Sequence, residues 1–312
     1  MIALEHLTRR FGNAAAVDNV SLDIPRGALC ALIGPSGSGK STTLRMINRL
    51  IEPSSGRVMF DGSDAATIAD LRLRIGYAIQ SVGLFPHWTV ARNIATVPNL
   101  LGWPRARRDA RVRELLTLLD LDPALARRYP HQLSGGQAQR VGVARALAAE
   151  PEALLMDEPF GALDPITRLG LQDELRRIHQ ATGTTIVLVT HDMEEALRLA
   201  DIIAVMRDGR LVQAGSPADL LRAPADGFVR DFVGGGEAGL RLLGLQTAGA
   251  LADPRTTAEG EPIPASATLR EVLSILIARR ADAMAVADER GRILGAVRLD
   301  DIIARAAQAD AR

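Results

Sequence analysis

The stretch Gly34-Pro-Ser-Gly-Ser-Gly-Lys-Ser41 (GPSGSGKS) sets the interpretation of the whole chain. It fits the pattern G-x-x-x-x-G-K-[ST], in which glycines let backbone N–H groups close around phosphate oxygens. The apolar run 28–33 (ALCALI) before it predicts a buried strand, and residues 42–50 after it predict a helix whose N-terminus adds a positive dipole end. This strand–loop–helix context favours a phosphate-binding loop over a glycine-rich turn that only imitates one.

Lys40 is the single lysine in a chain with 36 arginines, so its position is informative. A compact ammonium on a thin stem can reach the β- and γ-phosphates of a nucleotide through the loop, whereas the planar fork of arginine is too broad. Ser41 supplies a hydroxyl for Mg²⁺. The residues predicted to bind the phosphates are Gly34, Pro35, Ser36, Gly37, Ser38, Gly39, Lys40, Ser41 and Thr42.

Two adjacent acids close a second apolar run, in Leu154-Leu-Met-Asp-Glu158. Asp157 is predicted to hold the Mg²⁺ shell, and Glu158 to polarise the attacking water. Two solvated acids at a strand end are the alternative, which the phosphate loop upstream makes the weaker one. GTP specificity usually requires an N-K-x-D element, and no second lysine exists to build it. The expected nucleotide is therefore ATP, bound with Mg²⁺.

The composition narrows the class of protein. Thirty-seven basic residues balance 37 acidic ones, so no nucleic-acid partner is indicated. No apolar run reaches the ~18–20 residues of a membrane helix, and the N-terminus lacks a signal-peptide pattern, so we expect a soluble chain. The only cysteine, Cys30, excludes an internal disulfide and is expected to be a small buried residue of a strand.

Alternating apolar runs and helical stretches predict an α/β fold. The runs 153–156, 185–189 and 202–206 are typical of buried parallel strands, and 105–121 has apolar residues at helical spacing. We expect a large domain over 1–235 with a helical subdomain at about 88–150, and a Gly/Ala/Leu-rich linker over 236–255. A small unit over 256–312 follows, with a helix at 269–279, strands at 283–287 and 293–297, and a helix at 299–307.

The motif Ser134-Gly-Gly-Gln137, within LSGGQAQR, gives the chain a family resemblance. From about residue 1 to 233 it resembles the ATP-binding cassette (ABC) ATPases, whose signature motif is LSGGQ; the resemblance implies their P-loop NTPase fold. Phe11 stands where the family stacks an aromatic ring, more often Tyr, on adenine. Gln80 matches the glutamine that touches Mg²⁺ and faces the membrane subunit, Asp164 matches the D-loop, and His191 matches the switch histidine that contacts the γ-phosphate.

These matches imply a divided catalytic site. Catalysis is assigned to Lys40, Gln80, Glu158 and His191, and the Mg²⁺ ligands would be Ser41, Gln80 and Asp157. A serine and glycines that open a helix can form a second anion-binding N-terminus, although a simply capped helix is the alternative. In the family two cassettes pack head to tail, so the resemblance implies a homodimer. Ser134 and Gly136 would act on the ATP of the other copy. The resemblance also places Gly135, Gln137 and Asp164 among the nucleotide-binding residues.

The resemblance also implies a role in transport. ATPase chains that have no membrane span of their own resemble the ATPase subunits of bacterial importers. The expected partners are therefore integral membrane permease subunits and, indirectly, a periplasmic or lipid-anchored solute-binding protein. The expected location is the cytoplasmic face of the inner membrane. Residues 74–97 are particularly similar to importers of glycine betaine, choline and carnitine. An importer of another solute, such as an amino acid or a sulfonate, or a non-transport ABC ATPase, remains an alternative.

The last unit is similar to a single cystathionine-β-synthase (CBS) motif, through Gly295-Ala-Val297 and Asp301. One motif is present where two usually pair, so pairing would need a second subunit. Arg298 stands where ligand-binding examples often have Thr or Ser, which argues against adenosine binding. A regulatory role and a purely structural dimerisation role both stay open.

Overall fold

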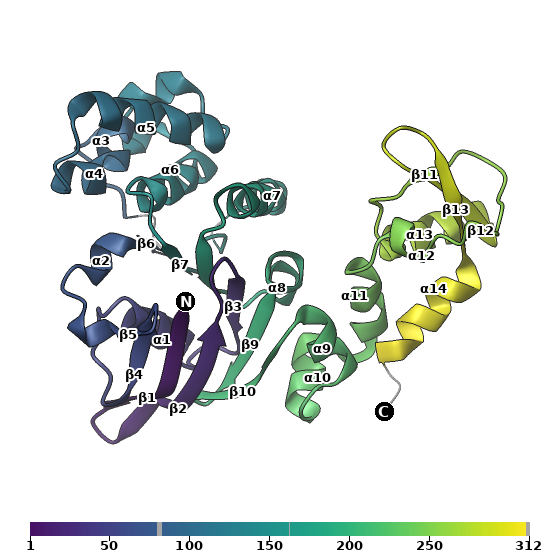
Figure 1. Cartoon of the computed structure of the whole chain (residues 1–312), viewed down its shortest axis with the longest axis horizontal. Helices are drawn as coiled ribbons and strands as arrows, with labels where there is room; N and C mark the ends of the chain where they lie inside the picture. Colours follow the sequence, from purple (N-terminus) through teal and green to yellow (C-terminus); the bar gives the residue numbers. More distant parts are fainter. Residues whose placement is uncertain (80–82, 162, 310–312) are drawn as a thin grey trace. The chain divides into compact units, whose positions relative to one another are not determined.

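The computed structural model describes residues 1–79, 83–161 and 163–309. The chain divides into two compact units, residues 1–214 and 215–312, which Figure 1 colours along the sequence. Among the described residues, no helix is both long and apolar enough to cross a membrane.

A six-stranded sheet forms the centre of the first unit. Its order is β10 (Arg210–Gly215), β9 (Ile202–Arg207), β3 (Leu29–Ile33), β8 (Thr185–Val189), β7 (Ala153–Asp157) and β6 (Ile75–Ala78). The pairs from β9 to β6 are parallel. Every residue of β3, β7 and β8 is buried, as continuous apolar runs predict for strands covered on both faces. The α/β prediction is confirmed.

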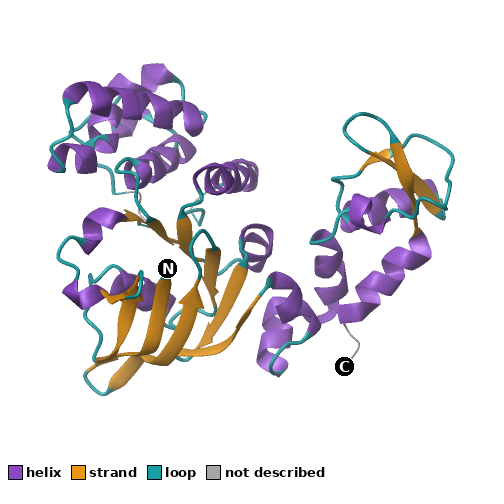
Figure 2. Ribbon diagram, viewed as in Figure 1, coloured by secondary structure: helices purple, strands orange, loops and turns teal. Residues whose placement is uncertain are grey.

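A second, antiparallel sheet packs beside it (Figure 2). Its order is β2 (Ala14–Ile24), β1 (Ile2–Phe11), β4 (Ser55–Phe60) and β5 (Ser63–Asp64). Helix α1 (Lys40–Ile47) shares one core with both sheets, through Leu44 and Ile47 on the helix and Leu32 of β3. The helix that follows the phosphate loop is therefore fixed by burial of its apolar face.

The first unit also contains the helical region that the sequence predicts. This region holds α3 (Val90–Ile94), α4 (Thr96–Leu100), α5 (Arg105–Leu118) and α6 (Gly135–Leu147), and it follows a short helix α2 (Leu71–Arg74). The apolar stripe of α5 is buried at Val112, Leu115 and Leu116. Helices α7 (Pro165–Thr182) and α8 (Met193–Leu199) follow β7 and β8.

The second unit contains the small fold predicted at the end of the sequence. Helix α13 (Leu269–Arg279) and strand β12 (Ala283–Ala287) have the predicted bounds, and β13 (Ile293–Arg298) and α14 (Leu299–Ala306) differ by one residue. Strand β11 (Ile263–Pro264) pairs with β12 in parallel, and β12 with β13 antiparallel. Helices α9 (Pro217–Arg222), α10 (Gly227–Val233), α11 (Ala238–Gly244) and α12 (Ala248–Leu251) precede them.

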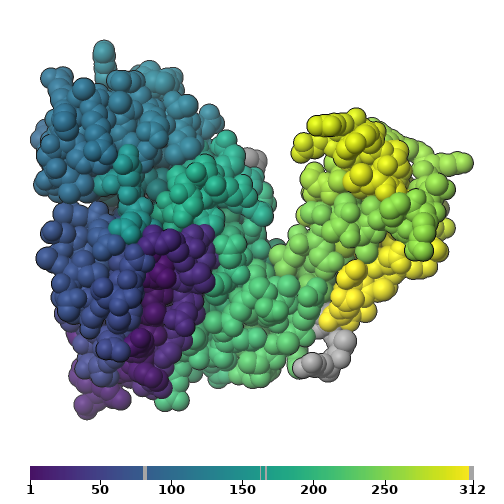
Figure 3. Space-filling model, viewed as in Figure 1, coloured from purple at the N-terminus to yellow at the C-terminus, as the bar shows by residue number. Residues whose placement is uncertain are grey.

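The linker predicted over 236–255 is wrong in this structure. Leu242 and Leu243 of α11 are fully buried, and Leu243 belongs to the same core as Leu269 of α13. The small residues that suggest a loose chain allow close packing instead: a Cβ on Gly239 would lie 2.8 Å from the Ala306 carbonyl oxygen. In Figure 3 the green atoms of this segment adjoin the yellow atoms of the last helix. The large unit also ends at 214 rather than 235.

The packing of α11 can be tested by truncating one side chain. Leu243→Ala should lower the free energy of unfolding of the second unit by about 2–5 kcal/mol, because it leaves a cavity in the core. Leu240→Ala, on the exposed side of the same helix, should change it by less than about 0.5 kcal/mol. Hydrogen exchange of α13 and β12 in the full chain, followed with increasing urea, measures both. Equal protection in the two variants would contradict a packed α11.

Candidate functional site

The phosphate loop follows the carboxyl end of β3 and turns directly into α1. Gly34 and Gly39 have φ values of +149° and +98°, a region that side chains disfavour. A Cβ on Gly34 would lie 2.1 Å from the Met206 carbonyl oxygen, and one on Gly39 would lie 2.4 Å from that of Ala16. Only glycine fits at both positions. Pro35, Ser36 and Gly37 at the tip of the loop are exposed, and Thr42 is half-buried in the first turn of α1.

The Lys40 side chain is buried against its own loop. Its Nζ donates hydrogen bonds to the carbonyl oxygens of Gly34 at 2.7 Å and Pro35 at 2.9 Å. Burial lowers the pKa of this ammonium, and the charges of Glu158 and Asp157 partly oppose that shift. The lysine thus spans the loop, with two acids close enough to affect its charge.

Ser41 and Asp157 form a pair of oxygen donors beside the loop. The Ser41 hydroxyl donates to Asp157 Oδ1 at 2.7 Å, and Arg45 lies 3.7 Å from Asp157 Oδ2. A carboxylate and a hydroxyl are ligands that Mg²⁺ accepts. The buried Ser38 hydroxyl has no hydrogen-bond partner among the described residues. The loop therefore has one more oxygen that is available to hydrogen-bond a ligand. These residues fit a Mg²⁺–nucleotide. Gln80, the third predicted ligand, lies outside the described residues.

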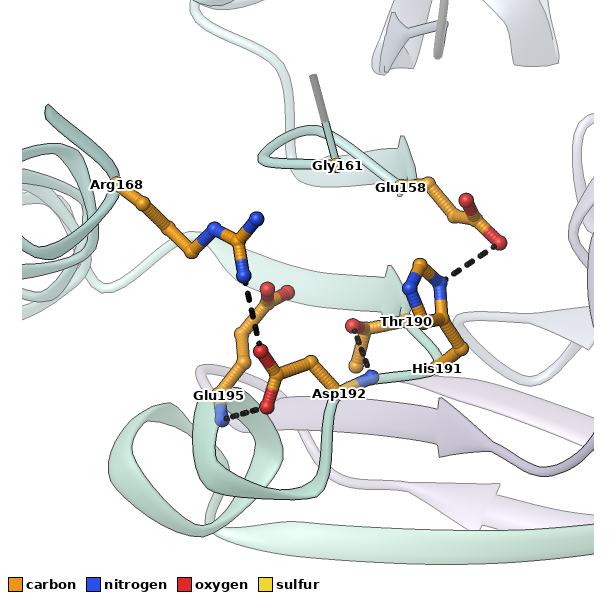
Figure 4. Close-up of a pocket in the computed structure, with 7 residues that line it drawn as sticks. All are labelled: Glu158, Gly161, Arg168, Thr190, His191, Asp192 and Glu195. Carbon is orange, nitrogen blue, oxygen red and sulfur yellow. Dashed lines mark hydrogen bonds and ion pairs between the residues drawn. The ribbon is translucent and has the colours of Figure 1, made fainter. Parts of the chain in front are cut away.

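Glu158 and His191 meet because β7 and β8 pair in register. Asp157 pairs with Val189, so the residues that follow the two strands emerge side by side. His191 Nδ1 lies 3.4 Å from Glu158 Oε1, as Figure 4 shows. Glu158 has a φ of +45°, and its N–H donates to the Val189 carbonyl oxygen at 2.9 Å. A non-glycine residue in this conformation costs energy and must be held by its surroundings.

A pocket surrounds this pair and includes residues that the sequence did not indicate. It is lined by Glu158, Gly161, Arg168, Thr190, His191, Asp192 and Glu195 (Figure 4). Glu195 is buried, and desolvation raises its pKa to about 8. Asp192 is recognisable in hindsight as the N-cap of α8. Nothing in the sequence separates Arg168 from the other arginines of α7.

The predicted signature motif opens α6. Ser134 Oγ accepts a hydrogen bond from the Gln137 N–H at 3.2 Å, and Gln137 Oε1 accepts one from the Ser134 N–H at 3.0 Å. The Gln137 side chain is thereby turned back onto the helix end, as a capping box. Ser134 and Gly135 are exposed, and a Cβ on Gly136 would lie 2.7 Å from Thr167 Cγ2 of α7. The start of α6 therefore packs closely on α7 while its tip faces outwards.

Phe11 and Asp164, two further predicted site residues, lie at the ends of a strand and a helix. Phe11 ends β1 and is 50% exposed, with the Arg9 guanidinium 4.6 Å from its ring centroid. Asp164 caps α7 by accepting a hydrogen bond from the Thr167 N–H at 3.1 Å. An exposed ring is available for stacking on a base.

Known proteins match both units. The ABC transporter family model matches residues 17–161, and the CBS domain model matches 261–307. The glycine betaine uptake system ATP-binding protein YehX of Escherichia coli K12 is 52% identical, over 98% of this chain and all of that protein. The sulfate/thiosulfate import ATP-binding protein CysA of Thermosynechococcus vestitus is 50% identical, over 75% of this chain and 69% of that protein.

Among solved structures, the dimeric bacterial ABC transporter cassette MJ0796 is similar with a TM-score of 0.63 and 35% identity, over 69% of this chain and 98% of that one. Residues 261–307 are a CBS domain, and residues 34–41 lie within the segment that matches the ABC transporter model. Because it is 52% identical, over 98% of its length, to the ATP-binding protein of an uptake system and matches the ABC transporter model, the chain belongs to the ATPase subunits of ABC transporters.

Proposed function

We propose that this chain energises an ABC importer for glycine betaine and related quaternary amines, such as choline and carnitine. One observation supports the solute class. The glycine betaine relative matches 98% of the chain at 52% identity, whereas the sulfate relative matches 75% of it at 50% identity. The match that extends through the C-terminal unit favours the quaternary-amine relatives.

The chemistry is assigned to residues around the phosphate loop. The glycine loop and Lys40 Nζ bind the β- and γ-phosphates, with Lys40 exchanging the Gly34 and Pro35 carbonyl oxygens for phosphate oxygens. Ser41 and Asp157 would hold Mg²⁺, with Gln80 as a third predicted ligand; the ion neutralises charge on the phosphates. Phe11 stacks on the adenine.

Glu158 and His191 act at the γ-phosphate end. Glu158 orients and polarises the attacking water, and its left-handed backbone fixes where the carboxylate points. His191, 3.4 Å from that carboxylate, contacts the γ-phosphate. The pair is therefore sensitive to whether that phosphate is present.

The working form is proposed to be a homodimer. The exposed start of α6, with Ser134 and Gly135 at its tip, would bind the ATP held by the phosphate loop of a second copy through backbone N–H groups. Asp164 caps α7, the helix whose Thr167 approaches Gly136 at the start of α6. Two bound ATP molecules close the dimer and hydrolysis reopens it. The dimer would attach peripherally to permease subunits at the cytoplasmic face of the inner membrane, which receive solute from a solute-binding protein.

Lys40→Arg tests the need for a lysine in the loop. The charge is kept, but the guanidinium is too wide for the space between the Gly34 and Pro35 carbonyl oxygens. We expect the affinity for Mg-ATP to fall at least about tenfold, a loss of about 1.4 kcal/mol of binding free energy. Calorimetric titration measures this loss. Wild-type affinity in Lys40→Arg would refute the argument.

Glu158→Gln separates ATP binding from hydrolysis. The amide cannot act as a base, so kcat should fall about 10²–10⁴-fold while ATP still binds. The variant should accumulate as an ATP-dependent dimer on size-exclusion chromatography.

Adding Ser134→Arg to Glu158→Gln should abolish the dimer and leave ATP binding by the monomer near normal. Undiminished turnover in Glu158→Gln excludes the assigned base, and a dimer that survives Ser134→Arg excludes binding in trans.

The solute class is tested by uptake. Cells that lack this chain should lose uptake of labelled glycine betaine or choline, and the wild-type chain should restore it while Glu158→Gln should not. Labelled sulfate and an amino acid serve as controls. If betaine and choline uptake persist and uptake of another solute is lost, the proposed solute class is wrong.

A further inference from the structure

Helix α7 contacts the loop that carries His191 through one arginine in its first turn. Arg168 Nη1 donates to Asp192 Oδ2 at 3.2 Å, and its Nη2 donates to the Leu163 carbonyl oxygen at 3.3 Å. Both side chains of the ion pair are about 31% exposed. The guanidinium thus joins the segment that follows Glu158 to the segment that contains His191.

Asp192 divides its two carboxylate oxygens between two elements. Oδ1 accepts hydrogen bonds from the N–H groups of Glu194 at 2.9 Å and Glu195 at 3.2 Å, which caps α8. Oδ2 faces Arg168. The Asp192 N–H donates to the Thr190 hydroxyl at 3.0 Å, so His191 lies between two residues that are bonded to each other. Fixing Asp192 therefore fixes the backbone on both sides of the histidine.

Arg168 is the single arginine among the described residues that line this pocket, and two acids face it (Figure 4). It forms an ion pair with Asp192, and its charge partly opposes the rise that burial causes in the pKa of Glu195. Glu195 Oε1 and Arg168 Nε have no hydrogen-bond partners among the described residues. Without the arginine, Asp192 Oδ2 would lose its ion pair, and the loop that carries His191 would lose this contact with α7.

We propose that Arg168 is a positioning residue for ATP hydrolysis, which holds His191 at the γ-phosphate end of the site through Asp192. The inference rests on the proposed role of His191. It concerns the rate of the chemical step, because neither Arg168 nor Asp192 belongs to the phosphate loop or to the metal-binding pair.

Two variants, each of which removes one charge of the ion pair, test this. Arg168→Gln removes the charge. Asp192→Asn keeps the cap on α8, since an asparagine oxygen still accepts from the two N–H groups, but turns an amide group toward Arg168. Each variant should lower kcat about tenfold or more, while KM and the Kd for Mg-ATP stay within about twofold, as expected when an interaction serves the transition state. The double variant should be no slower than the slower single one, because both remove the same contact.

Two further variants control the experiment. Arg168→Lys keeps one contact to Asp192 and should recover part of the lost kcat. Arg176→Gln, on the exposed side of the same helix, should leave kcat unchanged. Wild-type kcat in Arg168→Gln, losses that multiply in the double variant, or Mg-ATP affinity that falls in parallel with kcat would each overturn the proposal.

His191→Ala distinguishes failure of this inference from failure of the proposed function. If His191→Ala hydrolyses ATP at the wild-type rate, the assigned role of the histidine is wrong, and the inference is wrong with it. If His191→Ala is slow and Arg168→Gln is as fast as wild type, only the positioning role of Arg168 is wrong.

Discussion

The parallel register of β7, β8 and β3 is the constraint on which the site depends. Asp157 lies opposite Val189 at the last paired position, and β3 pairs with β8 on its other side. Since parallel strands end at one edge of a sheet, the two acids, the loop that carries His191 and the glycine loop leave the sheet together. Aliphatic strands buried on both faces therefore bring together polar groups that are more than 100 residues apart in sequence.

The sequence predicts the sheet and the glycine loop well, because each is indicated by a short run of neighbouring residues. Apolar runs mark the strands, and the glycines of the loop are required by positive φ values and by close backbone approach at Gly34 and Gly39. The contacts of Arg168 could not be predicted, because they depend on how far α7 is turned toward the loop after β8, which only the packed structure fixes. Because the chain has 36 arginines, residue type alone does not distinguish Arg168 from the others.

The error over residues 236–255 has a different origin. Glycine and alanine weaken the periodic apolar pattern, so the segment resembles a linker. In the structure the same small residues let α11 approach α14, while Leu243 and Ala248 enter the core formed by α13 and the small sheet. The CBS motif is thus completed by helices that precede it in the chain. A regulatory role and a purely structural role in dimerisation both stay predictions for this unit.

The scarcity of lysine has a chemical consequence. Lys40 carries the single side-chain amine of the protein, so any acylation of a lysine can modify this chain only inside its phosphate loop. A nucleotide that carries an acylating group would therefore label one residue per chain, and the amount of label would count the nucleotide sites that are filled.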